Sequence, residues 1–486
     1  MNSPTNGRGI RTGKEYLAGL QDTREVWLAG KRVADVSCEP GLARGARSLA
    51  GFMDKQFDPA HADLLTYADD GHRYGMAFLT PRSQNDVTRR GAAFYEWARW
   101  SNGMFGRTPD YKNASLMAFA AGADFLAQGR PEFGANMRRY YQYVRDHDKV
   151  LTHTLVNPTF NHAQAKDGKY SDKVALQIVR ETDAGIVVNG ARLLATLGPV
   201  ADEIEVFPSS LLTASPDNLP FAFAFALPIA TPGLRLICRD TYDHAQSHFD
   251  APLASRFEEM DAVVVFDQVL VPWERVFMYR EPLLCNRAFA ETNAVVHMMH
   301  QVVCSKLAKA EFIVGLLCAM ARATGKDKDM EVKAQIAEAM WIAESVRAFR
   351  YAGEGQAHAD QRGVFAPLRR PLDTSRNLFP KMYPRLIELV QLLGSSSLVA
   401  TPCEADFSNA IGPDVAQYFQ TVNLNSRDRV ALFRLAHDVA VSAFGGRQTL
   451  YERFFFGPQN IMASIYFDLY DKDEMIARVE TLLASS

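Results

Sequence analysis

The chain has 486 residues, of which 48% are hydrophobic and 22% are charged, and its formal net charge is −3. One hydrophobic core rarely serves more than about 250–300 residues, so we expect a globular protein with two or three packed domains. Charges of both signs are mixed along the chain and form no basic stripe, which argues against nucleic acid as a partner.

Residues 1–148 are predicted to form an N-terminal helical domain. Thr12 is followed three positions later by Glu15, which is the spacing of a capping box. Ser83 opens a second stretch in which large apolar residues recur at helical spacing. A further helix is expected to begin at Pro131, because proline is favoured at the first helical position.

Residues 149–281 differ in character and are predicted to form a middle antiparallel β domain. Short segments rich in β-branched and aromatic residues alternate with Gly, Pro, Asn and Asp, as in strands joined by turns. The segments are "KVLTHTLVNP", "KVALQIVRET", "AGIVVNGARLLAT", "FAFAFALP", "LRLICR" and "DAVVVFDQVLVPW".

Residues 282–486 return to helices, now long and amphipathic, and are predicted to form a C-terminal four-helix bundle. Gly325 is a candidate C-cap for the first of them. The predicted fold class is therefore α+β and mostly α. The expected bundle helices cover residues 301–325, 331–355, 378–394 and 426–446.

No segment of the chain predicts a membrane or secreted protein. The longest apolar runs, "FIVGLLCAM" and "LPFAFAFALPIA", are shorter than the roughly 18–20 residues that cross a bilayer. The N-terminus lacks the apolar core of a secretory signal. The 6 cysteines are scattered without a CxxC pair, so we expect reduced thiols in a cytoplasmic protein.

Cofactor and metal motifs are largely missing. No GxGxxG follows a predicted strand and no GxxxxGK[ST] occurs, so neither a Rossmann nor a P-loop cradle is expected. His297, His300 and Cys304 could share one helix face and have the chemistry of metal ligands. No carboxylate or CxxC accompanies them, so a packed helix is the better interpretation and no metal is predicted.

Two stretches carry side chains suited to a reactive site. In "GMFGRTPDYKN", residues 103–113, Arg107 and Tyr111 stand four residues apart in a predicted turn. They either decorate a surface corner or point into a pocket. His153 lies in the middle of the predicted strand "LTHTLVNP". Taken alone, such a histidine is more often a hydrogen-bonded core residue than a catalytic one.

Two further stretches also stand out. The strand that ends at Thr196 leads into a loop containing Ser209 and Ser210. In "FGGRQ" two glycines interrupt a predicted helix, at a cost of about 1 kcal/mol each relative to alanine. They either allow close backbone approach to an anion, with Arg447 adding charge, or form an ordinary helix-to-helix turn.

These stretches belong to a larger set of matching motifs. The chain resembles the oxygenase component of the two-component 4-hydroxyphenylacetate 3-monooxygenases, which are reduced-flavin-dependent phenol hydroxylases with an acyl-CoA dehydrogenase-like fold. The helical, β and bundle order of that fold agrees with the order predicted above. The motifs are "RTGKEYLAGLQDTREVWLAGKRVADV", "GRTPDYKN", "THTLVNP", "ETDAGIVVNGARLLAT", "SRFEEMDAVVVFDQVLVPWERVFMYRE" and "FGGRQTLYE".

The resemblance implies a set of site residues. The family's catalytic and substrate-binding arginine, tyrosine and histidine fall on Arg107, Tyr111 and His153, and its substrate-tail loop falls on Ser209 and Ser210. That loop differs in length from the family pattern, so the identity of the substrate stays open. Many relatives have Asp-Arg in place of the Asn-His at positions 161 and 162. The implied flavin contacts are His153, Thr154, Leu155, Thr159, Phe160, Asn161, His162, Thr196, Phe444, Gly445, Gly446 and Arg447.

The resemblance also implies a reaction. FAD arrives reduced, as FADH2, by diffusion from a separate NAD(P)H-flavin reductase. It reacts with O2 to a C4a-hydroperoxide, which hydroxylates a small phenol ortho to its hydroxyl and gives a catechol. Free phenols have a pKa of about 10, and the phenolate is the better nucleophile. Arg107 then supplies a permanent cation, His153 accepts the proton and Tyr111 donates a hydrogen bond. A homo-oligomer, tetramer or dimer, is also implied.

Three alternatives remain open. An acyl-CoA dehydrogenase-like flavoenzyme acting on a CoA ester would need a carboxylate base in the bundle and tightly held oxidised flavin. An iron–sulfur dehydratase on the same fold would need clustered cysteines near the first active-site loop, and none occurs between Cys38 and Cys238. A helical interaction scaffold would leave "GRTPDYKN" and "FGGRQ" without a purpose.

Overall fold

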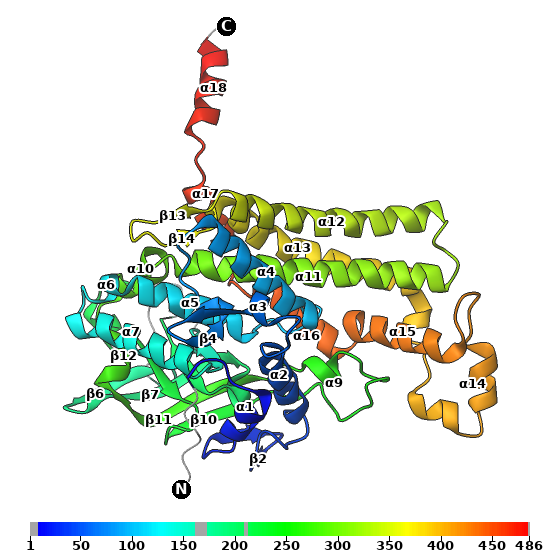
Figure 1. Ribbon diagram of the computed structural model, residues 1–486, viewed down its shortest axis with the longest axis horizontal. Coiled ribbons are helices and arrows are strands. Elements are labelled where there is room, and N and C mark those ends of the chain that lie inside the picture. Colours follow the sequence, from blue (N-terminus) through cyan, green and yellow to red (C-terminus); the bar gives the residue numbers. More distant parts are fainter. Residues whose placement is uncertain (1–7, 161–172, 209–211, 485–486) are drawn as a thin grey trace.

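Helices and sheets form separate layers in the computed structural model, which describes residues 8–160, 173–208 and 212–484 (Figure 1). The long C-terminal helices lie along the top of this view, and the sheets lie at the lower left. One hydrophobic cluster runs from the sheets into the bundle, so the layers share a core.

The N-terminal part is mainly helical, and its predicted caps are confirmed. Thr12 and Glu15 close a capping box at the start of α1, and the Ser83 hydroxyl accepts a hydrogen bond from the backbone N–H of Asp86 in α4. The helices are α1 (Gly13–Gly19), α2 (Ala43–Lys55), α3 (Ala62–Leu65), α4 (Gln84–Trp100), α5 (Pro109–Ala121), α6 (Ala123–Leu126) and α7 (Pro131–Asp146).

This part also contains short strands that the sequence analysis did not predict. Residues 66–69 and 72–75 form a hairpin with each other. Residues 25–28, strand β1, instead join the six-stranded sheet of the middle part, where Glu25 pairs with Arg235. A strand of four residues shows too little alternation to be recognised, and its pairing partner is far away in the chain. The strands are β1 (Glu25–Leu28), β2 (Lys31–Arg32), β3 (Thr66–Asp69) and β4 (His72–Gly75).

The middle part forms two sheets, in the orders β2-β1-β10-β11-β7-β6 and β12-β9-β8-β5. Most neighbours are antiparallel, as predicted, but β1 with β10 and β5 with β8 are parallel. A short helix, α9 (Ala254–Phe257), precedes β11. The strands are β5 (Leu151–Thr154), β6 (Gln177–Thr182), β7 (Gly185–Thr196), β8 (Glu203–Val206), β9 (Phe223–Pro228), β10 (Leu234–Cys238), β11 (Asp261–Pro272) and β12 (Val276–Tyr279).

The C-terminal part is a bundle centred on α11, which is buried along most of its length against α4, α5, α12 and α13. α15 packs on α11 and α13 as the fourth bundle helix. Gly325 follows α11 with a φ of +70°, the geometry of a glycine that ends a helix. The elements are α10 (Pro282–Glu291), α11 (Ala294–Ala323), α12 (Met330–Gly355), β13 (His358–Ala359), β14 (Phe365–Ala366), α13 (Arg369–Gly394), α14 (Gly412–Tyr418), α15 (Ser426–Ala440), α16 (Ala443–Phe454), α17 (Gln459–Leu469) and α18 (Asp473–Ala484).

The last helix, α18, projects away from the bundle and has no buried residue (Figure 1). Its apolar side chains are at least 47% exposed and recur at the spacing of one helix face. They are Met475, Ile476, Val479, Leu482 and Leu483. Within the described ranges, we find no helix with the length and apolarity to cross a bilayer.

Candidate active site

The turn before α5 directs Arg107 and Tyr111 inward, which decides between the two interpretations left open by the sequence. Tyr111 is only 2% exposed, and Cζ of Arg107 lies 4.4 Å from the centre of its ring. Pro109 starts α5, so Tyr111 lies in the first turn of that helix. Gly103 has a φ of +69°, and a Cβ there would lie 2.6 Å from Cβ of Lys309. Glycine therefore lets the turn pack against α11.

His153 reaches the same space from β5. Its ring centre lies 5.9 Å from that of Tyr111. The neighbouring Thr152 and Thr154 each donate a hydroxyl hydrogen bond of 2.7 Å to a carbonyl oxygen of β7. Because successive strand side chains point to opposite faces, His153 points away from β7. Burial, with the cations Lys112 and Arg107 adding to it, lowers the pKa of His153 well below its ordinary value, so the imidazole is neutral.

Aromatic rings enclose the guanidinium of Arg107. Its Cζ lies 4.4 Å from the ring centre of Phe455 and 5.5 Å from that of Tyr451. Its Nη1 is buried and has no hydrogen-bond partner among the described residues. An unpaired buried donor costs about 1–3 kcal/mol. This atom is therefore suited to an acceptor on a bound molecule.

A chain of polar contacts ties β7, β11 and α16 to the turn. Thr196 Oγ1 donates to Asp261 at 2.6 Å, and Arg447 donates to both oxygens of Asp261 at 2.8 and 3.0 Å. Arg447 also donates to Glu259 at 2.8 Å, and the other Glu259 oxygen accepts the backbone N–H of Arg107 at 2.6 Å. The network brings Thr196 and Arg447 close to Arg107, but two carboxylates already neutralise the charge of Arg447.

The "FGGRQ" segment forms the first turn of α16, after a break in the helix. Ser442 caps α16 by accepting a hydrogen bond from the backbone N–H of Gly445. Phe444 is 2% exposed in the core, and a Cβ on Gly445 would lie 2.3 Å from the carbonyl oxygen of Val439. Gly446 has no atom within 4 Å of such a position. Close packing of α15 on α16 explains the first glycine, and the turn between the two helices lies at Val441 and Ser442, before the glycines.

The structure describes only part of the segment predicted after β5, and none of the predicted substrate loop. Thr154 is buried and Leu155 is partly buried, whereas Thr159 is exposed and Phe160 is 62% exposed. The predicted site residues that lie outside the described ranges are Asn161, His162, Ser209 and Ser210.

Sequence reasoning missed a cavity beside Arg107, between α11, α13 and the junction of α16 and α17. The space inside it that a water-sized sphere can occupy is about 30 Å³, well below the range of small-molecule sites. Phe455 and Phe456 give it an apolar wall, and Lys306 and Arg376 give it cations. The aromatic run "YERFFF" was the available signal, but aromatic residues at the end of a helix usually indicate core packing.

Two lysines of α11 share one carboxylate beside this cavity. Glu452 of α16 is ion-paired with Lys306 and Lys309, and the side chains of all three are at most 6% exposed. Burial lowers the pKa of Lys306 to about 8, although Glu452 opposes this shift. Arg376 is paired with Asp373, so the excess positive charge comes from the two lysines that share Glu452, and it favours an anionic group.

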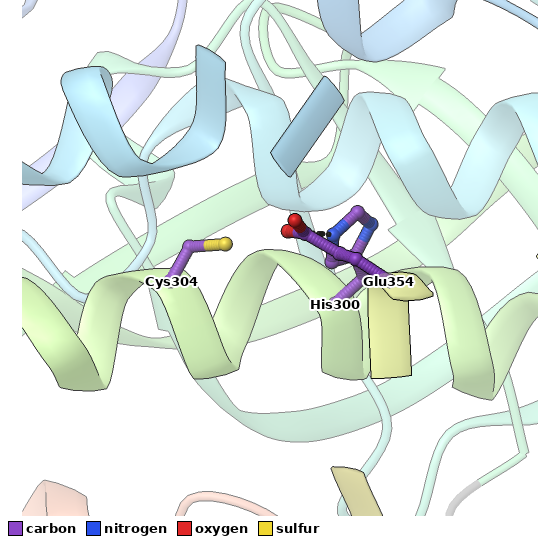
Figure 2. Close-up of side chains that lie close together, drawn as sticks. All are labelled: His300, Cys304 and Glu354. Atoms are coloured by element: carbon purple, nitrogen blue, oxygen red, sulfur yellow. Dashed lines mark hydrogen bonds and ion pairs between the residues drawn. The ribbon is translucent and has the colours of Figure 1, made fainter. Parts of the chain in front are cut away.

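His300, Cys304 and Glu354 lie close together in the interior, with ligand atoms within 4.8 Å of one another (Figure 2). The sequence analysis found no carboxylate near the histidines, and that premise was wrong, because α12 packs on α11 and supplies Glu354. Glu354 Oε1 is hydrogen-bonded to His300 Nε2 at 2.9 Å and to Arg350 Nε at 2.8 Å. A guanidinium on that oxygen disfavours a second cation, so the group is a buried ion pair within α12 whose carboxylate also hydrogen-bonds His300 of α11.

The fold is that of the acyl-CoA dehydrogenase-like class, and its candidate site brings Arg107 and His153 close to Tyr111. Two models of one protein family, one for the N-terminal part and one for the C-terminal part, match the chain. The 4-hydroxyphenylacetate 3-hydroxylase N-terminal model matches residues 12–278, and the C-terminal model of the same name matches residues 285–484. The chain therefore belongs to the 4-hydroxyphenylacetate 3-hydroxylase family.

Individual relatives agree with this assignment over the full length. The chain is 44% identical to the 4-hydroxyphenylacetate 3-monooxygenase oxygenase component of Thermus thermophilus, covering 98% of both chains. It is 33% identical to the oxygenase component of a 4-nitrophenol 2-monooxygenase from a Rhodococcus species, covering 92% of this chain and 86% of that one. A crystal structure of a 4-hydroxyphenylacetate 3-monooxygenase oxygenase component with FAD and 4-hydroxyphenylacetate superposes with a TM-score of 0.94 at 43% identity, covering 98% of both chains.

These matches confirm the family and the fold class expected from the sequence. They also confirm the expected activity, in which a two-component flavin-dependent aromatic monooxygenase hydroxylates a phenol to a catechol. FAD and O2 are confirmed as cofactor and co-substrate of this activity. The roles of individual residues remain predictions.

Proposed function

We propose that this oxygenase hydroxylates 4-hydroxyphenylacetate, or a phenol of similar size, next to its hydroxyl group. The observation that carries the proposal is the buried guanidinium of Arg107, stacked on Tyr111 with one N–H unpartnered among the described residues. The relatives named for 4-hydroxyphenylacetate and for 4-nitrophenol share a phenol with a compact para substituent. Such a ring suits a small site lined by arginine, tyrosine and histidine.

Three side chains divide the work on the phenol. Arg107 stabilises the phenolate, because a guanidinium remains charged at any physiological pH. His153 accepts the phenolic proton. Burial and the neighbouring cations lower the pKa of His153, so this transfer depends on Arg107 stabilising the phenolate and thereby lowering the pKa of the phenol. Tyr111 keeps its own proton, since burial raises its pKa, and donates a hydrogen bond to the substrate oxygen.

The residues around the site fit a bound flavin. FAD, when bound in its reduced form, would supply two electrons to activate O2, so that one oxygen atom enters the phenol and the other leaves as water. Phe455 and Phe456 offer aromatic faces that exclude water, and Lys306 and Arg376 suit an anionic group. The cavity as it stands has room for about one water, so it would have to widen to admit a ring system. The proposed flavin contacts of the family pattern are His153–Leu155, Thr159–His162, Thr196 and Phe444–Arg447.

The CoA-ester alternative requires a carboxylate that can act as a base in the bundle. Glu452 lines the cavity, but Lys306 and Lys309 both hold it as an ion pair. These cations lower the pKa of Glu452, against the effect of burial, and make it a weak base. This geometry favours the phenol hydroxylase.

A separate NAD(P)H-flavin reductase is the proposed source of FADH2, delivered by diffusion. The name "oxygenase component" of the relatives supports this, since it implies a second component. The proposed site of action is the cytoplasm. All six cysteines are free thiols, which is typical of a reducing compartment.

The test of the activity is a panel of small phenols supplied with FADH2 from any flavin reductase. The products are scored as catechol and hydrogen peroxide. We expect catechol from 4-hydroxyphenylacetate at close to one equivalent per flavin oxidised, and colourless protein as purified. Peroxide alone with every phenol, or tightly held oxidised flavin together with turnover of an acyl-CoA, would contradict the proposal.

We also propose that the protein is a homo-oligomer, a tetramer or a dimer, in which α18 packs on a second copy. Its exposed apolar face would otherwise remain in water, as would Ile461 and Phe467 of α17. Light scattering should give a mass above that of one 54.1 kDa chain. Ending the chain at Tyr470 should lower the mass or weaken the assembly, and a monomeric full-length protein at micromolar concentration would disprove the proposal.

A further inference from the structure

A buried ion pair lies next to His153 and has no part in the mechanism above. Lys112 of α5 and Glu205 of β8 are 2.6 Å apart, and their side chains are 3% and 0% exposed. Burial raises the pKa of Glu205, and Lys112 opposes the shift. Glu205 Oε1 also lacks a hydrogen-bond partner within the described ranges. Two well-packed apolar side chains would often be at least as stable as such a pair, so stability alone does not account for it.

The sheet places this pair against the imidazole. β5 and β8 are parallel, with His153 directly opposite Glu205 in the register. Parallel partners point to the same face of a sheet, and neighbouring strands are only about 4.8 Å apart. Lys112 follows Tyr111 in the first turn of α5, so its ammonium enters the same layer from the helix side.

The strand register places Glu205 beside His153, whereas the charges that shift the pKa of His153 are those of Lys112 and Arg107. Arg107 and Lys112 are cations, and Tyr111 stays protonated. On the opposite side of β5, Arg192 of β7 donates to the carbonyl oxygen of Leu155. These groups, by element, are Arg107, Tyr111 and Lys112 from the turn and α5, Glu205 from β8, and Arg192 from β7.

We propose that Lys112 is a positioning residue for the hydroxylation. By holding the charge of Glu205, it prevents that carboxylate from drawing a proton onto His153. The histidine then enters the reaction as a neutral acceptor. In the wild type, the ammonium of Lys112 is the cation that pairs with Glu205. Without Lys112, a protonated His153 would become the cation beside that carboxylate. This inference rests on the proposed role of His153 as the group that accepts the phenolic proton.

The experiment separates the loss of Lys112 from the loss of the whole pair. In Lys112→Met, the pKa of His153 should rise to its ordinary value of about 6.5 or above, because a neighbouring cation is lost and the carboxylate of Glu205 is left unpaired beside the imidazole. In Lys112→Met/Glu205→Met the rise should be smaller, and in the wild type the imidazole should stay neutral. The measurement is histidine NMR on the full chain without ligand, with the His153 signal assigned by comparison with His153→Gln. This measurement does not depend on the substrate or on turnover.

Coupling should follow the same pattern. At pH 6, the catechol formed per flavin oxidised should fall about tenfold in Lys112→Met. A tenfold loss is expected when the pKa of the base, His153, lies one unit above the pH of the assay. The double variant should recover the wild-type ratio. Glu205→Gln should keep wild-type coupling, and it also serves as the test if Lys112→Met does not fold. The matched control removes the ion pair between Arg275 and Glu203, whose charged atoms are 2.7 Å apart. Glu203 lies two residues before Glu205 in β8, and this change should leave the pH profile of coupling unchanged.

Three results would overturn the inference. They are a neutral His153 with normal coupling in Lys112→Met, a double variant as uncoupled as the single one, and lost coupling in Glu205→Gln. Failure of the wild type to form catechol from any phenol would instead disprove the proposed function. In that case the titration of His153 would still decide the role of Lys112.

Discussion

Replacing Asp110 by asparagine is expected to stabilise the protein at neutral pH. Asp110 follows Pro109 in α5, directly before Tyr111, and is 2% exposed. Its oxygens accept hydrogen bonds from Gln301 Nε2 at 3.3 and 3.4 Å. Burial raises the pKa of Asp110 to about 6, even though these hydrogen bonds favour the charged form.

The magnitude follows from the two pKa values. The folded value of about 6 exceeds the unfolded value, about 3.9, so the stabilising contribution of the protonated form is complete below about pH 4 and is lost as the pH rises through 6. Two pKa units correspond to about 3 kcal/mol. Asparagine stays neutral and can still accept from Gln301. Asp110→Asn should therefore gain about 2–3 kcal/mol at pH 7 and almost nothing near pH 4.

Thermal unfolding between pH 4 and 8 measures this difference. With an unfolding entropy of about 2.1 cal/mol/K per residue, the gain corresponds to a rise in Tm of about 2–3 °C at pH 7. Asp124→Asn is the matched control, because the Asp124 side chain is 79% exposed, and it should change Tm little at any pH. A Tm gain that is the same at all pH values, or a loss at pH 7, would refute the reasoning.

Three other perturbations have defined outcomes. Arg107→Ala should lower catechol formation about 100- to 1000-fold while flavin oxidation continues, with the oxygen recovered as hydrogen peroxide; unchanged coupling would place Arg107 outside the site. Arg447→Met leaves the buried carboxylate of Glu259 without a cation, while Asp261 keeps Arg239, and it should cost about 3–5 kcal/mol in urea unfolding at pH 7. Arg287→Met is the control: this arginine is paired with Glu291 but its side chain is 60% exposed, so its loss should cost less than about 1 kcal/mol. Equal losses of stability in the Arg447 and Arg287 variants would contradict the prediction. FAD affinity, followed by fluorescence, should fall as the pH rises through 8 in the wild type but not in Lys306→Met; identical profiles would exclude a role for this lysine.

Local signals predicted the elements well. Thr12 with Glu15 marks the start of α1, and Gly325 marks the end of α11, because each end is determined by a few adjacent residues. The boundaries between helical and β character were also visible, since β-branched runs differ from amphipathic periodicity over many residues. β1 was missed because a pairing partner far along the chain, rather than its own four residues, makes it a strand.

The candidate site was predictable to a different degree. The resemblance indicated Arg107, Tyr111 and His153, and the fold brings these three together. No local pattern indicates that Glu205 lies beside His153, because their strands meet through a parallel pairing. The cavity wall at Phe455 was also missed, since a buried aromatic residue looks the same in sequence whether it fills a core or lines a pocket.

The pairing of β1 with β10 constrains how the chain folds during synthesis. About 200 residues separate the two strands, which at about 5–20 residues per second means an interval of roughly 10–40 s between their appearance. Throughout that interval β1 has no neighbour to pair with except β2. Conversely, a chain lacking its first 32 residues would expose β10 as an edge strand, open to pairing with another molecule. The N-terminal segment thus protects the sheet from aggregation as well as completing it.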